Sequence, residues 1–365
     1  MRVWPRLLVL GAGLALLGSL GAHLLRYRPF RTAPELAVRA PRRGHDAPVI
    51  GADRGDLPRQ LLPTLQAATP PLSQTENLLL AGIDTRPDGF SISSAPQPAP
   101  PSTFGRTDAL VLVVIDRRSK HVGLVGIPRD LVLDLPDEGL VRINTVFLRG
   151  SRAGGGDEGA RRLRQAVRHL LGLAVDHTVF LDHAGFEALV DDLGGIAVDV
   201  ACPIRDRFLD PRGPGGRVEL RLEAGTHWLD GRTALMFARS RHGRGVTDRA
   251  RRQLAVLAGL RDRVSQLGSH RMAELLPRLR QTVYTDMTTL DLLRLLRLAL
   301  NVPRERIHGL VLDWRHVTPV QLDDGRRVML PRPEAIAQDL SRLFEAGPPG
   351  ARRSAACPPM DAALR

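Results

Sequence analysis

The stretch GRTDALVLVVIDRRSKHVGLVGIPRD (residues 105–130) holds two short apolar runs, ALVLVVI and HVGLVGI, which are separated by the polar residues DRRSK. Short apolar runs that are rich in β-branched residues and joined by a polar turn are typical of a β-hairpin. The first run has no polar alternation, which predicts a strand that is covered on both faces. We therefore expect this hairpin to lie within a sheet that has a layer on either side.

Charged residues stand at both ends of this hairpin. If its turn centres near Arg118, strand pairing brings Asp108 beside Arg129, with Arg106 and Asp130 next to them. Two arginines and two carboxylates then gather at one edge of the sheet. A surface salt bridge, which is common and contributes little stability, is the competing interpretation.

The composition is that of a globular protein with an excess of base. Of 365 residues 43% are hydrophobic and the formal net charge is +13, with Lys120 the only lysine among 52 basic residues. Codon bias accounts for the preference for arginine but not for the excess of base over acid. That excess favours an anionic partner such as a phosphate-bearing polymer, a membrane surface or nucleic acid. Nucleic acid is the least favoured, because no helix-turn-helix, zinc spacing or aromatic stacking pattern is present.

An uncharged segment, LLVLGAGLALLGSLGAHLL (7–25), follows the N-terminal six residues. Its length suits a helix that spans a bilayer. A cleaved signal peptide is the alternative, but the run is longer than a usual signal core and no small-x-small site follows it, so we favour an uncleaved anchor. The two cysteines, Cys202 and Cys357, lack metal-ligand spacing, and the sequence leaves open whether they pair.

Composition divides the rest of the chain into a stalk, a domain and a tail. The predicted segments are a short N-terminus (1–6), which is cytoplasmic if the domain lies outside, the anchor (7–25), a Pro/Arg-rich stalk (26–75), a globular domain (76–345) with a flexible Pro/Ser-rich insert (91–104), and a disordered tail (346–365). Within the domain, apolar periodicity predicts strands over 77–84, 177–182 and 196–200, helices over 157–172, 184–195, 250–267, 288–300 and 333–345, and short strands within 306–331. Interleaved strands and helices predict an α/β (α+β) fold with a central mixed sheet flanked by helices.

A second group of arginines lies in RSRHGRGVTDRARRQ (239–253). A helix is expected to begin near Thr247–Asp248, which puts Arg249 and Gln253 on one face of its first turns. A helix start offers free N–H groups and a partial positive charge, and guanidinium groups suit phosphate oxygens. We therefore predict a phosphate site here; an arginine-rich surface loop is the alternative.

Two aspartates follow or begin neighbouring strands near these arginines. Asp84 ends the run NLLLAGID, and Asp108 begins the next strand. Paired carboxylates beside arginines suggest a Mg²⁺ site that substrate phosphates complete. The alternative is that both aspartates only pair with the arginines.

Taken together, these stretches resemble the LytR-CpsA-Psr family of cell-wall glycopolymer transferases. The resemblance covers about 76–345 and rests on an ordered set of motifs, which are NLLLAGIDTR, GRTDALVLVVID, VGIPRDLVLDL, RINTVF, DHTVFLDHAGFEALVDDLGGIAVDV, LEAGTHWLDGRTALMFARSR and DRARRQ. The sequence departs from the family pattern at Arg142, Arg244 and Asp248, and in the insert 91–104.

The resemblance implies a sheet flanked by helices, with an apolar groove for a polyprenyl chain. It implies a membrane-anchored enzyme whose domain lies outside the cytoplasm and which moves a glycopolymer from a polyprenyl-pyrophosphate carrier to peptidoglycan through a phosphodiester. The implied metal ligands for Mg²⁺ (or Mn²⁺) are Asp84 and Asp108. The implied pyrophosphate-binding residues are Arg106, Arg129, Arg239, Arg241, Arg249, Arg252 and Gln253.

The implied catalytic residues are Arg129, Asp108 and Asp130, with Asp130 or a metal-bound aspartate accepting the proton of the sugar hydroxyl. Two other functions stay open. A pyrophosphatase would use the same site with water as the acceptor. A lipid- or glycan-binding scaffold, or a regulator of envelope genes, would have no turnover.

Overall fold

The computed structural model describes residues 72, 75–84, 105–136, 138–240, 246–267, 274–275, 277–278, 283–321 and 327–345. The predicted anchor (7–25), insert (91–104) and tail (346–365), and almost all of the predicted stalk (26–75), lie outside these ranges. Within the ranges, no helix combines the length and the apolarity that crossing a bilayer requires.

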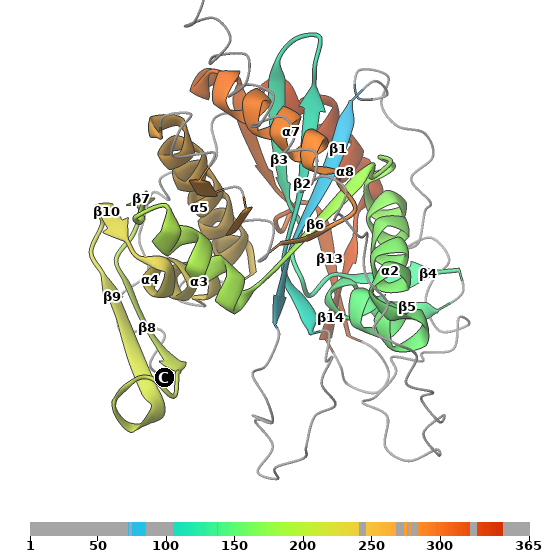
Figure 1. The fold of residues 1–365 in the computed structure, drawn as a ribbon. Coiled ribbons are helices and arrows are strands. Elements are labelled where there is room, and N and C mark those ends of the chain that lie inside the picture. Colours follow the sequence, from blue (N-terminus) through green and yellow to red (C-terminus); the bar gives the residue numbers. More distant parts are fainter. Residues whose placement is uncertain are drawn as a thin grey trace, which may run out of the picture.

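A six-stranded sheet forms the centre of the domain, in the order β11-β6-β1-β2-β3-β12 (Figure 1). Its strands are β1 (Glu76–Asp84), β2 (Arg106–Asp116), β3 (His121–Gly126), β6 (His177–Asp182), β11 (Val283–Thr285) and β12 (Ile307–Val311). β1 runs parallel to β6 and β3 parallel to β12, whereas the other neighbours are antiparallel. The mixed central sheet is therefore confirmed.

The hairpin that the sequence predicts is formed by β2 and β3. The two strands pair from Asp116 opposite His121 to Val111 opposite Gly126, and residues 117–120 make the turn. Lys120 takes a left-handed conformation in that turn, with φ 57°. Side chains alternate along β2 between two apolar layers, since Leu110 and Leu112 belong to one cluster and Val111 and Val113 to another. A strand covered on both faces is thus confirmed.

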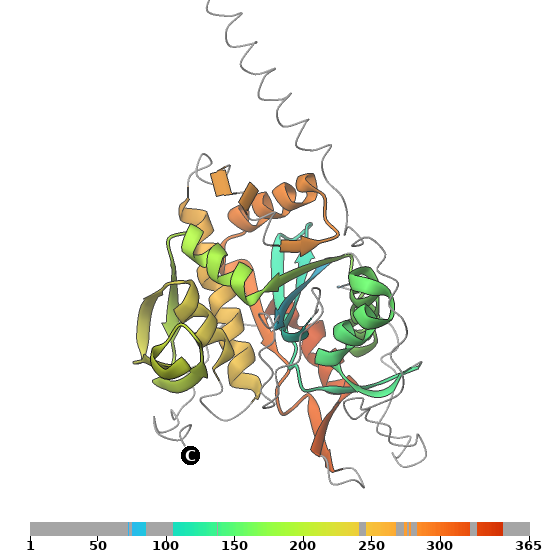
Figure 2. The same ribbon diagram turned by 60° about the horizontal axis from the view of Figure 1, so that its bottom comes forward.

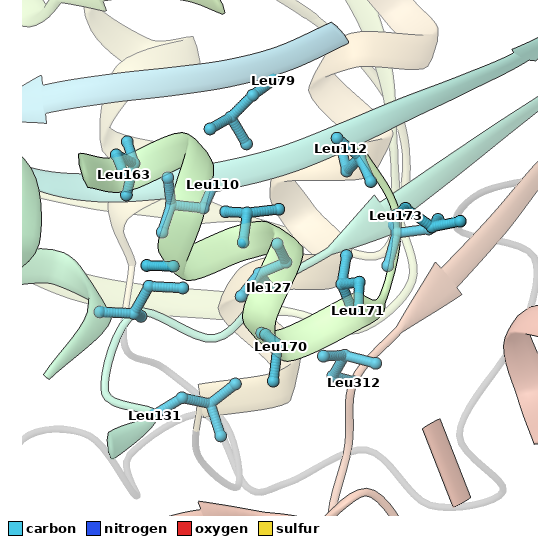
Figure 3. Close-up of a cluster of buried hydrophobic side chains, with 14 of the residues drawn as sticks. Leu79, Leu110, Leu112, Ile127, Leu131, Leu163, Leu170, Leu171, Leu173 and Leu312 are labelled. Carbon is cyan, nitrogen blue, oxygen red and sulfur yellow. The ribbon is translucent and has the colours of Figure 1, made fainter. Parts of the chain in front are cut away.

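The first layer covers one face of the sheet with α2 (Ile143–Leu171), α8 (Pro333–Ser341) and the 3₁₀ turn η5 (Leu343–Glu345). Figure 3 shows leucines of the strands and of α2 meeting in this core. Phe147 of α2 stacks on Phe180 of β6 with ring centroids 4.4 Å apart. Leu343 lies over Gly123 of β3, where an added Cβ would stand 2.3 Å from the leucine side chain.

Helix α2 is longer than the sequence predicts. It begins at Ile143, not at residue 157, and non-helical glycines at 154 and 155 interrupt it. Intrinsic propensity hides its first half, because β-branched residues and glycine are poor helix formers. Burial of Val146 and Phe147 against the sheet overrides that propensity.

The second layer covers the opposite face with α5 (Val246–Gln266) and α7 (Thr289–Asn301) (Figures 1 and 2). α5 begins at Val246, within two residues of the start predicted near Thr247–Asp248. Thr288 caps α7 in a capping box with Asp291, which satisfies free N–H groups of the first turn.

A smaller unit packs beside α5 around its own apolar cluster. It consists of α3 (His183–Asp192), β7 (Ile196–Val200), β10 (Gly225–Leu229), α4 (Gly231–Arg239) and an arm of two strands, β8 (Ile204–Leu209) and β9 (Arg217–Leu222). The sequence did not predict the arm, which extends away from the sheet in Figure 1. Two further hairpins complete the described fold, β4 (Val132–Leu135) with β5 (Gly139–Arg142), and β13 (Val317–Gln321) with β14 (Arg327–Pro331). Cys202, just after β7, is disulfide-bonded.

Candidate functional site

A β-bulge lies at Asp108, near the start of β2 and beside the end of β1. Ala109 pairs with Gly82 of β1, but Thr107 pairs with Ile83, so Asp108 has no partner opposite it. Regular alternation would put Asp108 on the α2 face with Leu110 and Leu112. Because a bulge re-aims side chains, the Asp108 carboxylate instead reaches Arg249 of α5 in the second layer.

Asp108 is held between two arginines. Its Oδ1 accepts from Arg129 Nη1 at 2.6 Å, and its Oδ2 accepts from Arg249 Nη2 at 3.0 Å. Only 11% of the Asp108 side chain, 18% of that of Arg129 and 9% of that of Arg249 are exposed. The hairpin therefore brings Asp108 beside Arg129 as predicted, and the pair is no surface salt bridge.

Gln253 also contacts Asp108, but through the backbone. Its Nε2 donates to the Asp108 carbonyl oxygen at 3.3 Å. Arg249 and Gln253 lie one turn apart on α5, on the shared face that the sequence predicts. The bulge removes Asp108 from the ladder, and the Gln253 amide supplies the hydrogen bond that its carbonyl would otherwise lack.

The electrostatics of this cluster keep Asp108 ionised and leave part of the buried Arg249 unpaired among the described residues. Burial raises the pKa of the Asp108 carboxyl, but Arg249 and Arg129 together lower it below its ordinary value, so Asp108 is ionised at neutral pH. Burial is also the main reason that the pKa of Arg249 is lowered, and Arg129 adds to the effect. Asp108 accepts from both guanidinium groups, and Asp130 lies 3.5 Å from Arg129 Nε. Buried Arg249 Nε has no hydrogen-bond partner within the described part of the chain. Such a cluster favours an anionic ligand.

Asp84 lies at the end of β1, next to a histidine that the sequence analysis missed. His183 Nδ1 is 3.8 Å from Asp84 Oδ1. Burial, followed by the charge of Arg239, lowers the pKa of His183, while Asp84 and Asp108 oppose that shift. Parallel pairing of Ile83 with Asp182 brings His183 to this edge, so a register argument from HTVFLDH could have found it.

The remaining predicted residues are spread around this cluster. Asp130 is about one-third exposed and lies 3.5 Å from Arg129 Nε. Arg239 ends α4 and lies over the Phe208 ring at 5.9 Å. Arg106 is exposed and pairs with Asp84 only in the strand register.

One predicted residue, Arg252, turns away from the cluster, and another lies outside the described structure. The Arg252 guanidinium donates to the Ser240 carbonyl oxygen at 2.5 Å, and burial lowers its pKa to about 10. Arg252 therefore holds the end of α4 rather than approaching Asp108. Arg241 lies outside the described residues.

Asp84 and Asp108 are the candidate ligands for a divalent cation. The described residues contain no cluster of three or more His, Cys, Asp or Glu side chains arranged for a metal. Mg²⁺ uses one or two carboxylates together with substrate phosphates, so Asp84 and Asp108 at one sheet edge fit such a site. Asp84 accepts no hydrogen bond from the described part of the chain, whereas both Asp108 oxygens already accept from arginines.

Comparison with known proteins gives the following matches. The model of the LytR_cpsA_psr family matches residues 64–328. The teichoic acid transferase TagT of Bacillus subtilis, named as transferring polyisoprenyl-linked teichoic acid to peptidoglycan, is 30% identical over 194 residues, which are 53% of this chain and 54% of TagT. The regulatory protein MsrR of Staphylococcus aureus is 28% identical over 159 residues, 43% of each chain.

The chain thus spans about half the length of these curated relatives. Among solved structures, TagV of Bacillus subtilis matches with a TM-score of 0.58 at 24% identity, over 75% of this chain and 98% of TagV. At that identity the match concerns the fold.

Proposed function

Because this chain belongs to the LytR-CpsA-Psr family, we propose that it is a phosphotransferase that moves a glycopolymer from a polyprenyl-pyrophosphate carrier to peptidoglycan. The name of TagT supports this reaction class and both substrates. The product would be a phosphodiester between the glycopolymer and the wall, and the second product would be polyprenyl phosphate.

The observation that carries the proposal is the buried cluster of Arg129, Asp108 and Arg249. A pyrophosphate that enters there would meet two guanidinium groups whose positions Asp108 fixes. Fixed donors in a site that excludes water stabilise the charge that develops on phosphoryl oxygens, and each is typically worth 10²- to 10³-fold in rate. Arg239, and Arg241 beyond the described residues, would add to the binding of the pyrophosphate.

The proposed step is an in-line displacement at the phosphorus that carries the glycan. A hydroxyl oxygen of the acceptor forms a bond to this phosphorus, the bond to the bridging oxygen breaks, and polyprenyl phosphate leaves with the electron pair. Asp130 is our candidate to accept the hydroxyl proton, because it is more exposed than Asp108 and no arginine donates to it as closely. Asp108 is a poorer base, since its pKa is lowered.

Asp84 and Asp108 would hold Mg²⁺ or Mn²⁺, and the ion would neutralise charge on the phosphate oxygens. Asp84 is the better available ligand. His183, beside Asp84, would help to position that carboxylate.

We assign the polyprenyl chain to the second layer, where partly buried apolar side chains of β1, β3, α5 and α7 lie. In this proposal residues 7–25 anchor the protein in the membrane as a single span, residues 26–75 form a stalk, and the catalytic domain lies outside the cytoplasm. The uncharged segment and the Pro/Arg-rich composition of the sequence support this arrangement.

The test uses the full-length protein in detergent with Mg²⁺ and a polyprenyl-pyrophosphoryl oligosaccharide, with and without a peptidoglycan fragment. Release of polyprenyl phosphate that requires the fragment supports the transferase. Arg129→Ala should abolish release, whereas Arg117→Ala, on the exposed turn at the other end of the sheet, should not.

Release that ignores the fragment would replace the transferase with a pyrophosphatase. MsrR, named a regulatory protein, makes a non-catalytic role the second candidate. Absence of release with several donor glycans, together with an unchanged cellular phenotype of Arg129→Ala, would favour that role.

A further inference from the structure

Helix α7 carries apolar side chains that the fold does not bury. Its inner stripe, Leu292, Leu295 and Leu298, packs against the apolar cluster between the sheet and the second layer. Its outer side exposes Leu290 by 53% and Leu293 by 38%. Neither of these two leucines belongs to any apolar cluster of the described residues.

Arginines continue the same outer stripe. Arg294 and Arg297 are exposed and follow Leu290 at the i+4 and i+7 positions, so all four outer residues share one face of the helix. Arg294 makes one long contact with Asp291, which is already used in the capping box. Arg297 has no ion pair among the residues that the structure describes. Two exposed leucines beside two exposed arginines let one face of α7 offer both apolar side chains and guanidinium groups to a lipid headgroup region.

More basic side chains surround this stripe at the same end of the molecule. Arg306, after α7, donates to the Ser119 carbonyl oxygen at 3.2 Å and so joins this end to the β2–β3 turn. That turn is exposed throughout and carries Arg117, Arg118 and Lys120. Of its acidic neighbours, Asp116 binds the turn itself and Glu76 binds Arg117. We call α7's outer stripe together with this turn and Arg306 the basic end.

The basic end lies where the described chain enters the sheet. β1 begins at Glu76, and Leu78 pairs with His177 of β6. Asp286, three residues before α7, accepts from the Thr178 backbone N–H at 2.8 Å and lies 3.7 Å from His177. The candidate site lies at the opposite end of β1, about 25 Å away at the rise of a β-strand. The uncharged segment 7–25 precedes the entry point in the sequence.

We propose that the basic end docks on an anionic phospholipid bilayer, with Leu290 and Leu293 at the boundary between headgroups and acyl chains and the arginines on lipid phosphates. This inference goes beyond the proposed function and does not require turnover. A second copy of the chain is a poorer occupant, because a symmetric contact across α7 would bring Arg294 and Arg297 of both copies together.

The experiment compares two labelled positions in the full-length protein in vesicles. Leu293→Cys lies in the basic end, and Leu209→Cys, at a leucine that is 62% exposed on the arm, is the matched control. Each carries an environment-sensitive fluorophore, and the unsubstituted chain gives the labelling background. Two kinds of vesicle are compared, one with the anionic lipid phosphatidylglycerol and one with zwitterionic lipid. Both contain brominated lipid, which quenches a fluorophore that enters the bilayer.

Docking predicts lipid quenching at position 293 and not at position 209, and weaker quenching in zwitterionic vesicles. Arg294→Gln and Arg297→Gln should each lower the ratio of docked to undocked protein about fivefold at low salt. This factor corresponds to the binding free energy of about 1 kcal/mol that one basic residue contributes near an anionic surface. High salt should reduce docking in the same direction, because it shortens the Debye length.

Three results would overturn the inference. Equal quenching at both positions means that the domain lies on the bilayer without this orientation. No quenching at either position means that the domain stands away from the membrane. Shielding of position 293 from iodide without lipid, growing with protein concentration, means that a second copy covers the face. Release of polyprenyl phosphate in detergent is measured separately, so failure of docking and failure of the proposed function remain distinguishable.

Discussion

The two faces of the central sheet are built differently, although the same strands supply both. Among the residues that the structure describes, the α2 face gathers thirty buried apolar side chains and three partly buried ones. The face under α5 and α7 gathers seven buried and nine partly buried ones. Among the described side chains, those of the first face are mostly fully buried, and those of the second face are mostly partly buried.

This difference separates the tasks of the two layers. Burial of apolar surface contributes about 25 cal/mol per Å² to stability. A fully buried side chain of the α2 face therefore contributes more than a partly buried one of the second face. Partly buried leucines and valines leave apolar surface that a ligand can still cover. The cluster of Asp108, Arg129 and Arg249 lies at the edge of this second face, because the bulge turns Asp108 towards it.

The largest effect on stability is expected in the core on the α2 face. Phe147→Ala removes a fully buried ring that stacks on Phe180, and should lower the free energy of unfolding by about 3–5 kcal/mol. Chemical denaturation with an unchanged slope measures this loss. A cost below about 1 kcal/mol would show that the α2 face is no better packed than the other.

The largest effect on activity is expected at the edge of the second face. Arg249→Ala should reduce turnover about 10²- to 10³-fold, because it removes a fixed donor to the pyrophosphate. Arg251→Ala is the matched control, since Arg251 is two residues further along α5, more exposed, and paired with Asp248. Similar losses in both variants would remove Arg249 from the site.

A smaller and different effect is expected for Leu257, a partly buried leucine on α5 in the second layer. Leu257→Ala should cost less stability than Phe147→Ala and should raise KM for a long-chain polyprenyl donor about fivefold, which corresponds to about 1 kcal/mol of lost apolar contact. A short-chain donor should show little change. If KM rises equally for both donors, the apolar chain does not bind on this face.

The smallest effect is a dependence on pH that only the second face should show. The pKa of Asp108 lies below 3.8 in the folded protein, so its contribution to stability is present above about pH 4 and is lost as the pH falls through the folded value. The difference in unfolding free energy between the wild type and Asp108→Asn should therefore hold from about pH 6 to about pH 4 and shrink as the pH falls from about 4 to about 2. A constant difference across this range would contradict the assigned ion pairs.

The sequence predicts elements well where apolar periodicity is strong. The bounds of the hairpin, β6, β7, α5 and α7 all lie within four residues of the expected ones. The first half of α2 was missed because its helical state depends on packing against the sheet. The β8–β9 arm was missed although β9, RVELRL, alternates polar and apolar residues, while β8, IRDRFL, shows no regular alternation.

Part of the candidate site could also be predicted. The meeting of Asp108 with Arg129 follows from strand pairing, and that of Arg249 with Gln253 follows from helical spacing. The bulge could not be foreseen, because a register shift depends on the partner strand as much as on β2 itself. The contact of Gln253 with the Asp108 carbonyl could not be predicted without the bulge. Nothing in the sequence indicates that Arg252 turns towards Ser240.

The contact of Leu343 with Gly123 has a consequence for the order of folding. The three described atoms nearest to a Cβ at Gly123 all belong to Leu343, 220 residues later in the chain, and a side chain on β3 would leave no room for them. Until residue 343 emerges during synthesis, the α2 face of β3 stays uncovered and the core cannot close. We therefore expect the domain to complete its folding only once residue 343 has left the ribosome, and a chain that ends before Leu343 to remain prone to aggregation.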